Sequence, residues 1–512
     1  MSKKKVIVVG AGINGLVISN YLSRDNFDVL LLEKSERVGG ACVSDSVNIN
    51  NDKVTFAKGA TVLGMMPNFI FNETGLSDKV QIFSPYFQKI VYYESDDTII
   101  NIYKDPKELS KELHNKVGET GDILGFRNDE NKVIEFIREG YRKGIPPNIE
   151  DAETKLGRNL VNLWIKGSAR NLLDHYFTSD KTKLYMGMTV IESSPESIDS
   201  EGSAFTIPLM DSGSVFDGYW GYVKKGIWQI TEQLEKVNIS HGVKIKTSAE
   251  IDSIDEESKK VILDNGDEYS YDVLVFATDP LTPSKFLDDR SLIDSLKSKK
   301  NIGTSGKVTA FFKNKVEWRD HSQSDKSLSS FRFIFSVDNL DEFEHRSINS
   351  LNGVSDYEPG YIQVYCEGAA QRHLGNHEKY DKLIFFTKNI SYDKPGSDLD
   401  EVHEKIKQKV FQYITNPSDC VHSVFLTPKD MKNEFYFPGG NIDHVMLTKG
   451  QNFHTRNYRL SQNLNFYNLG NYEDIFYCGA GSYPCGSVAG TPGYMCYKQI
   501  KQNPYLSAFI ND

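Results

Sequence analysis

Apolar positions near the N-terminus follow the order of buried strand, helix and buried strand. Residues 6–9, Val-Ile-Val-Val, form a β-branched run without a polar break, which is typical of a strand buried on both faces. Apolar residues then recur at helical spacing over residues 16–22, and residues 28–32 form a second strand-like run. This order predicts a β-α-β unit at the start of the chain.

Alternation of helical and strand-like patterns continues along the chain and predicts an α/β fold. The Asn-Gly pair at 265–266 is a strong signal for a hairpin turn between two strands. The predicted helices cover residues 105–117, 131–143, 159–164, 168–176, 228–237, 401–413 and 491–498. The predicted strands beyond the first unit cover residues 242–246, 250–254, 261–263, 268–269, 271–280, 306–312, 331–335, 361–365, 382–386 and 475–478.

Glycines occupy the junction between the first strand and the first helix. Gly10, Gly12 and Gly15 give the spacing G-x-G-x-x-G. In this spacing the first glycine allows a tight turn, the second lets a pyrophosphate approach the backbone, and the third lets helix and strand pack closely. Glu33 follows the second strand, where an acid accepts hydrogen bonds from an adenosine ribose and repels a 2′-phosphate. Strand, glycines, helix, strand and acid together predict a dinucleotide site at a helix N-terminus.

Charge and cysteine usage narrow the class of protein. The 512 residues carry 59 basic and 70 acidic side chains, a net charge of −11, which argues against a nucleic-acid partner. The six cysteines show no C-x-x-C pairing, so we expect no metal site and no disulfide framework. Neither a secretory signal nor a run of about 18 apolar residues is present. A cytoplasmic protein is expected, and shallow attachment to a membrane face stays open.

The segment that follows Glu33 indicates which dinucleotide cofactor is bound. Residues 36–44 contain R-x-G-G, formed by Arg37, Gly39 and Gly40. This segment resembles the one that the amine oxidase and phytoene desaturase superfamily of flavoproteins carries beside the FAD pyrophosphate. The resemblance implies FAD as the cofactor.

Two further stretches carry the same resemblance. Residues 54–63 resemble the family loop that passes the flavin ring, and residues 475–498 resemble the family order of strand, G-A-G, glycine-rich loop and helix. In relatives the N-terminus of that last helix faces the flavin pyrimidine and stabilises negative charge on the reduced ring. The cofactor contacts predicted from the residues and from the resemblance are Gly10, Ala11, Gly12, Asn14, Gly15, Glu33, Lys34, Arg37, Gly39, Gly40, Ala41, Gly59, Ala60, Thr61, Ile251, Gly479, Ala480, Gly481, Gly490 and Thr491.

The resemblance also implies how the chain is divided. A Rossmann-type FAD-binding domain is expected from residues 1–67, 220–285 and 465–512, with a discontinuous α+β substrate domain from 68–219 and 286–464. Residues 168–180 and 438–444 resemble the phytoene desaturase-like branch that includes the pyridine nucleotide-disulfide oxidoreductase domain-containing protein 2 group.

The implied reaction is removal of a hydride from a saturated carbon of a small apolar substrate of isoprenoid or carotenoid type. No second nucleotide fingerprint is present, so oxygen, a quinone or another carrier is left open as the electron acceptor. An amine oxidase-like flavoenzyme and an FAD-stabilised binding or regulatory protein are the alternatives.

No catalytic residue stands out from the sequence. Asp443 and His444 are adjacent and polar, which suits either acid–base work or a structural, substrate-orienting loop. Cys485 lies in the predicted flavin region and raises the question of a covalent thioether, although its surrounding motif differs from that of amine oxidases with such a bond.

Overall fold

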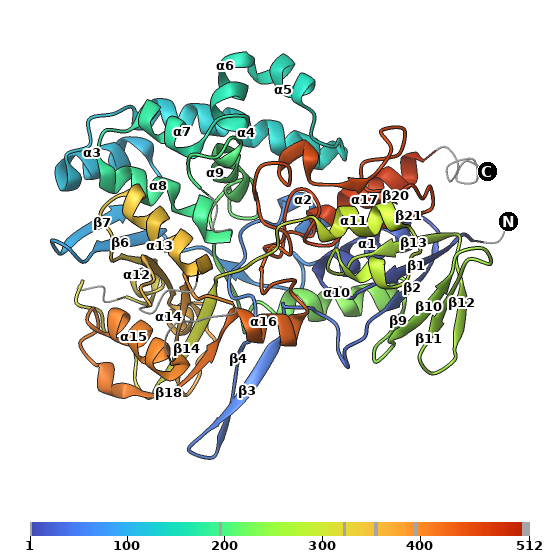
Figure 1. The fold of residues 1–512 in the computed structure, drawn as a ribbon. Helices are drawn as coiled ribbons and strands as arrows, with labels where there is room; N and C mark the ends of the chain where they lie inside the picture. Colours follow the sequence, from blue (N-terminus) through green and yellow to red (C-terminus); the bar gives the residue numbers. More distant parts are fainter. Residues whose placement is uncertain (1–2, 194–196, 321–323, 353–356, 393–397, 504–512) are drawn as a thin grey trace.

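The computed structural model describes residues 3–193, 197–320, 324–352, 357–392 and 398–503 (Figure 1). Its first layer is a five-stranded, all-parallel sheet in the order β21-β13-β1-β2-β9. These strands are β1 (Lys5–Val9), β2 (Asp28–Leu32), β9 (Lys244–Lys246), β13 (Val273–Phe276) and β21 (Ile475–Tyr477). The sheet thus gathers three stretches that are far apart in the sequence.

Strand β1 lies at the centre of this sheet and is buried on both faces, as its apolar run predicts. Val6 and Val8 pack into the large core that contains helix α1 (Ile13–Arg24). Ile7 and Val9 face the opposite side and pack into a second core. Because side chains alternate across a strand, the run without a polar break fills both cores. The α/β fold with a Rossmann-type parallel sheet is confirmed.

Helices cover one face of the parallel sheet and a small antiparallel sheet covers the other. Helix α1 packs between α10 (Gln229–Ser240) and α17 (Thr491–Gln502). The second core also takes in the three-stranded sheet β10-β11-β12. Its strands are β10 (Ile251–Asp255), β11 (Lys260–Leu263) and β12 (Glu268–Ser270). Gly266, with φ of +86°, lies between the last two strands and confirms the predicted hairpin turn.

A seven-stranded sheet in the order β18-β14-β17-β16-β15-β6-β7 forms the other half of the molecule. Its strands are β6 (Lys89–Tyr93), β7 (Thr98–Ile102), β14 (Gly306–Phe312), β15 (Phe331–Phe335), β16 (Tyr361–Tyr365), β17 (Asp381–Thr387) and β18 (Cys420–Leu426). The pair β6–β15 is parallel and the other pairs are antiparallel. Four of these strands match predicted ones, whereas β6, β7 and β18 were not predicted.

A group of helices forms a cap over this sheet (Figure 1). The cap helices are α3 (Pro106–Val117), α4 (Ile123–Lys143), α5 (Ile149–Leu156), α6 (Arg158–Leu160), α7 (Ala169–Tyr176), α8 (Asp180–Ser193) and α9 (Thr206–Met210). Helix α4 begins eight residues before the predicted start at 131 because Asp122 caps it by accepting from the Gly125 N–H. The helix predicted over 159–164 is present, with the difference that α6 passes into a π-helical turn over Val161–Ile165.

The remaining elements connect and flank these layers. The helices are α2 (Asn68–Glu73), α11 (Arg290–Lys297), α12 (Asp325–Leu328), α13 (Leu340–Asn352), α14 (Glu367–His373), α15 (Leu399–Phe411) and α16 (Pro428–Phe435). The strands are β3 (Ser44–Ile49), β4 (Asp52–Ala57), β5 (Ile82–Phe83), β8 (Tyr222–Val223), β19 (Tyr458–Arg459) and β20 (Leu469–Gly470). Of the described helices, none combines the length and the apolar character needed to cross a bilayer.

Candidate functional site

The glycine loop after β1 brings helix α1 against the sheet. Gly10 adopts φ of +97° and donates its N–H to the Leu32 carbonyl at 2.8 Å. A Cβ on Gly15 would lie 1.9 Å from the Gly10 carbonyl oxygen, so only glycine lets the helix approach the strand end this closely. A Cβ on Gly12 would meet no atom within 4 Å. The first and third glycines therefore serve the fold, while Gly12 faces open space at the helix N-terminus.

The Glu33 carboxylate is held at the glycine loop. It accepts hydrogen bonds from the N–H groups of Ala11 at 2.7 Å and Ser35 at 2.9 Å. A carboxylate has about four lone-pair sites, so capacity remains for two hydroxyl donors. The Glu33 carbonyl also accepts from the Ala249 N–H at 2.9 Å, which places Ile251 at the start of β10 near the end of β2. The predicted ribose acid and the predicted adenine residue thus come together.

Lys34 and Arg37 lie on the outer side of this region. Lys34 donates to Glu250 at 2.6 Å, and this bond raises the pKa of the lysine. The exposed Arg37 forms no ion pair with any residue that the structure describes. The Gly39 N–H donates to the Ala11 carbonyl at 2.8 Å, which fixes the R-x-G-G segment beside the glycine loop. Arg37 therefore lies next to the helix N-terminus without a direct ion pair among the described residues, although its charge helps to lower the pKa of Asp45.

The R-x-G-G segment also meets the predicted flavin loop. A Cβ on Gly40 would lie 3.3 Å from the Gly12 Cα. The Ala41 carbonyl accepts from the Ala60 N–H at 2.9 Å, and a Cβ on Gly59 would lie 2.3 Å from the same carbonyl oxygen. Thr61 follows and is buried. Three predicted stretches therefore lie side by side.

A buried lysine that the sequence reasoning missed holds this loop. Lys307 on β14 donates from Nζ to the carbonyl oxygens of Ala57 at 2.6 Å, Lys58 at 3.1 Å and Gly59 at 2.7 Å. Burial lowers the pKa of Lys307 to about 7. The sequence does contain one signal for this role: a single lysine interrupts Gly306–Phe312, whose other residues are apolar or small. Lys307 ties the seven-stranded sheet to the predicted flavin loop.

The N-terminus of α17 lies against the N-terminus of α1. A Cβ on Gly493 would lie 2.4 Å from the Asn14 carbonyl oxygen, and a Cβ on Gly490 would lie 2.8 Å from a Val17 methyl. Gly490, with φ of +68°, provides no side-chain cap for α17. The buried Thr491 hydroxyl and the Asn14 side-chain oxygen have no hydrogen-bond partner among the described residues. Two helix N-termini thus present uncapped N–H groups and unpartnered polar atoms to one region.

The G-A-G segment after β21 is fixed from both sides. A Cβ on Gly479 would lie 1.9 Å from the Thr278 carbonyl oxygen, so this glycine packs directly on the chain after β13. The Gly481 carbonyl accepts from the Tyr458 hydroxyl at 2.8 Å, and the Ala480 carbonyl accepts from Arg456 at 3.1 Å. This segment carries the chain from the sheet to the N-terminus of α17.

Asp443, His444 and Cys485 lie beside that segment. The Gly486 N–H is 3.4 Å from the Asp443 Oδ1, which joins residues 438–444 to the C-terminal loop. Burial lowers the pKa of His444 to about 4, so its imidazole is neutral at pH 7 and cannot supply a proton. Burial raises the pKa of Cys485 above its ordinary value, which leaves the thiol protonated and poorly nucleophilic. These surroundings disfavour acid catalysis by His444 and attack by Cys485.

Residues 13–378 match the family model described as flavin containing amine oxidoreductase, and this match covers more than half of the chain. The chain belongs to this family. It is an FAD-dependent oxidoreductase, and the predictions of an enzyme and of FAD as cofactor are confirmed. The broader resemblance to the amine oxidase superfamily is confirmed with them.

Individual relatives and solved structures are similar along nearly the whole chain of this flavoprotein. A 4,4'-diapophytoene desaturase (4,4'-diaponeurosporene-forming) of Staphylococcus aureus strain COL is 24% identical, with 94% of this chain and 95% of the relative covered. Cyclohexylamine oxidase from Brevibacterium oxydans superposes with a TM-score of 0.60 at 13% identity, with 100% of both chains covered. A putrescine oxidase bound to putrescine gives a TM-score of 0.57 at 14% identity over 97% of this chain and 98% of that chain. The two oxidases share the fold.

The region between α1 and α17 fits the flavin cofactor of this family. FAD carries a pyrophosphate, which suits two uncapped helix N-termini and the open side of Gly12. It also carries hydroxyl and ring polar groups that suit the unpartnered oxygens of Asn14 and Thr491. Among the described residues, no group of three or more His, Cys, Asp or Glu side chains is arranged to hold a metal ion.

Proposed function

We propose that this FAD-dependent oxidoreductase removes a hydride from a saturated carbon of an apolar substrate and so desaturates an isoprenoid or carotenoid-like chain. The observation that carries this proposal is the similarity to 4,4'-diapophytoene desaturase over 94% of this chain and 95% of the relative. We place the protein in the branch of the pyridine nucleotide-disulfide oxidoreductase domain-containing protein 2 group on the basis of residues 168–180 and 438–444.

The surroundings of the C-terminal loop support an apolar substrate. The buried Tyr483 ring lies 6.0 Å from Tyr141 and 6.3 Å from both Phe453 and Phe466, measured between ring centroids. Burial raises the pKa of Tyr483 and Tyr141, so both phenols stay neutral. These rings belong to one buried hydrophobic core, so the surroundings of the C-terminal loop are apolar and favour hydrocarbon over charged groups.

We further propose how the chain holds FAD, which supplies the hydride acceptor when bound. The N-terminus of α1 and Arg37 bind the pyrophosphate, Glu33 accepts from the ribose hydroxyls, and Ile251 packs on the adenine. Residues 59–61, held by Lys307, and the N-terminus of α17 position the ring. The FAD-binding domain comprises residues 1–67, 220–285 and 465–512, and the other two ranges form the substrate domain; residues 504–512 lie outside the described part.

Hydride removal asks for little acid–base chemistry from the protein. The neutral His444 and the buried Asp443 therefore act in this proposal as parts of an orienting loop. Oxygen, a quinone or another carrier takes the electrons away. Because a polyene precursor partitions into membranes, we propose a cytoplasmic protein that contacts a membrane face to reach its substrate.

Oxidation of an amine is the second candidate function, and the family description favours it. Such a reaction breaks a C–H bond beside nitrogen and needs the amine in its neutral form. The hydrocarbon part of such an amine would suit the same apolar surroundings of Tyr483.

An anaerobic reduction screen tests these proposals. Purified holoenzyme is mixed without oxygen with 4,4'-diapophytoene in vesicles, or with cyclohexylamine or putrescine in solution, and the flavin absorbance is followed. Bleaching by the polyene precursor alone supports desaturation, whereas bleaching by an amine, with peroxide formed on admission of air, supports amine oxidation. A yellow protein that none of these compounds bleaches favours a binding or regulatory role.

A further inference from the structure

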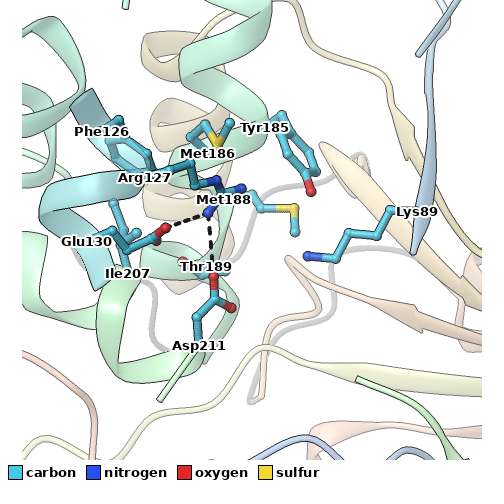
Figure 2. A pocket seen from close by; sticks show the side chains of 10 residues that line it. All are labelled: Lys89, Phe126, Arg127, Glu130, Tyr185, Met186, Met188, Thr189, Ile207 and Asp211. Carbon is cyan, nitrogen blue, oxygen red and sulfur yellow. Dashed lines mark hydrogen bonds and ion pairs between the residues drawn. The ribbon is translucent and has the colours of Figure 1, made fainter. Parts of the chain in front are cut away.

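Two groups of side chains outside the predicted cofactor contacts gather where the layers of the molecule meet. One group lines a small cavity between the cap helices and the seven-stranded sheet (Figure 2). Arg127 on α4 pairs there with Glu130 at 2.5 Å and with Asp211 at 4.0 Å. Because the guanidinium pairs with two acids of its own chain, this group is an ion-pair network that ties α4 to the chain after α9. The second group lies at the end of α16, against the predicted cofactor contacts.

The last turn of α16 packs on the predicted flavin loop. Glu434 pairs with Lys58 at 2.8 Å, directly before residues 59–61. The Phe435 ring lies so close to this loop that a Cβ on Gly59 would be 3.0 Å from its Cζ. One ion pair and one ring contact therefore fix the end of α16 beside the loop.

The next residue, Tyr436, lies beside the residues that we assign to the adenosine half of FAD. The centre of its ring is 5.6 Å from the Lys34 Nζ. Lys34 follows Glu33, the predicted ribose acid, and donates to Glu250 at 2.6 Å. Glu250 directly precedes Ile251, the predicted adenine residue. Tyr436 thus lies next to a group of residues that all border the proposed adenosine position.

The end of α16 therefore connects the two ends of the proposed cofactor path. Residues 434–436 span at most about 11 Å, yet they lie beside the flavin loop on one side and Lys34 on the other. Figure 1 shows α16 between the seven-stranded sheet and the half that contains the parallel sheet. Every cofactor contact predicted from the sequence comes from the expected FAD-binding domain, whereas α16 belongs to the expected substrate domain.

The backbone of Tyr436 has a conformation that a tyrosine does not favour. Its φ is +61° and its ψ is +28°, and its N–H donates to the Lys432 carbonyl at 2.9 Å where α16 ends. Glycine or asparagine usually takes such a position, because a bulky side chain is strained there. Burial does not offset this strain, since the side chain is 49% exposed and its hydroxyl has no hydrogen-bond partner among the described residues. A strained residue that gains so little from its own chain is typical of a functional position.

We propose that Tyr436 retains the cofactor by covering the adenosine half of bound FAD with its ring, an inference that rests on the proposed function and its placement of FAD. Adenine presents a flat aromatic face, and contact between such a face and a tyrosine ring is favourable without any charged group. Glu434 and Phe435 hold the same turn on the flavin loop. One short segment of the substrate domain thus closes over the cofactor that the other domain binds.

The rate at which the holoenzyme releases FAD after dilution, followed by the recovery of flavin fluorescence, tests this role. Tyr436→Gly and Tyr436→Asn both suit the positive φ but lack the ring, so each should release FAD about tenfold faster than the wild type. Tyr436→Phe keeps the ring and should release FAD at nearly the wild-type rate. Tyr86→Asn is the matched control, because Tyr86 is 64% exposed and contacts Phe87 and Lys326, which are not predicted cofactor contacts.

The absorption spectrum of the bound flavin gives a second readout. The visible bands of the Tyr436→Gly holoenzyme should match those of the wild type, because the ring is assigned to the adenosine half and not to the isoalloxazine. Shifted bands would place Tyr436 at the flavin ring and overturn the assignment to adenosine.

Release of FAD from Tyr436→Gly and Tyr436→Asn at the rate of the Tyr86→Asn control would overturn the inference. It would leave Tyr436 as a helix cap, a role that glycine and asparagine fill at least as well. Equally fast release from Tyr436→Phe would also overturn it, since the ring itself is meant to hold the cofactor. If Tyr436→Gly does not fold, the Tyr436→Asn result decides.

This inference and the redox proposal fail separately. Bleaching by 4,4'-diapophytoene together with unchanged FAD release from the Tyr436 variants overturns the role of Tyr436 alone. Faster release from Tyr436→Gly and Tyr436→Asn, without bleaching by any of the tested substrates, supports that role and counts against the redox proposal.

Discussion

Replacing Lys307 by methionine is expected to destabilise the protein and loosen the loop at residues 57–61. Methionine has a similar length but donates no hydrogen bond, so the three carbonyl oxygens at 2.6, 2.7 and 3.1 Å lose their common donor. The Ala57 carbonyl lies in a fully buried residue, whereas Gly59 is half-buried. At ~1.5 kcal/mol for each of the two short bonds, the unfolding free energy measured near pH 10, where the lowered pKa of Lys307 costs the folded state little, should fall by about 3 kcal/mol.

This loss translates into a measurable change of melting temperature. At ~2.1 cal/mol/K per residue, the 512-residue chain has an unfolding entropy of about 1.1 kcal/mol/K, so the midpoint should fall by about 3 °C. FAD should also dissociate more readily, which the release of flavin fluorescence during heating reports. Lys313→Met is the matched control, because Lys313 follows β14 and is exposed beside Asp419. A Lys307→Met protein that melts and retains flavin like this control would refute the reasoning.

The difference in stability between the wild type and Lys307→Met should change with pH in a direction that the pKa of Lys307 fixes. An unfolded lysine has a pKa of about 10.4, and burial lowers the pKa of Lys307 to about 7 in the folded protein. Between these values the unfolded chain binds one more proton than the folded chain, so stability that depends on Lys307 rises with pH. The difference in unfolding free energy between wild type and Lys307→Met should therefore widen from pH 7 to pH 9, by at most about 1.4 kcal/mol per unit. A difference that narrows over this range would contradict the lowered pKa.

Four further substitutions test the cofactor site and the residues that support it. Gly15→Ala should destabilise the apoprotein by several kcal/mol, because its Cβ would lie 1.9 Å from a carbonyl oxygen. Gly12→Ala should melt like the wild type when FAD is absent but should bind FAD weakly. Equal melting temperatures of the two variant apoproteins would contradict this prediction. Glu33→Gln should raise the FAD dissociation constant about tenfold in a fluorescence titration, and an unchanged constant would argue against its ribose role. Arg456→Met should lower the free energy of unfolding by ~4 kcal/mol, because several buried carbonyl oxygens, including that of Ala480, lose their hydrogen-bond donor. A denaturant midpoint near that of the wild type would disprove this prediction.

Local patterns predicted the parallel sheet, whereas contacts between distant segments escaped them. The β-branched run at 6–9 and the Asn-Gly turn at 265–266 determine their structure through neighbours in the sequence. Strand β6 has apolar and aromatic residues at 90–93, yet its parallel partner β15 lies more than 200 residues later, and no local pattern reveals that pairing. The hairpin of β3 and β4 also went unpredicted, since its mixed polar sequence is half-exposed.

The same distinction applies to the candidate site. Glycine spacing located the loop from Gly10 to Gly15, and the G-A-G motif located the approach to α17. Lys307 could not be assigned a role, because its carbonyl partners lie about 250 residues earlier in the chain.

The meeting of α1 and α17 has a consequence for biosynthesis. The glycine loop and Glu33 leave the ribosome early, but Gly490 and the N-terminus of α17 follow more than 450 residues later. At the usual rate of chain elongation, roughly half a minute or more separates the two events. A nascent or truncated chain that stops before α17 contains the N-terminus of α1 but lacks the second helix N-terminus that packs against it. With FAD placed as we propose, flavin loading comes last, and yellow colour marks chains whose synthesis has passed this helix.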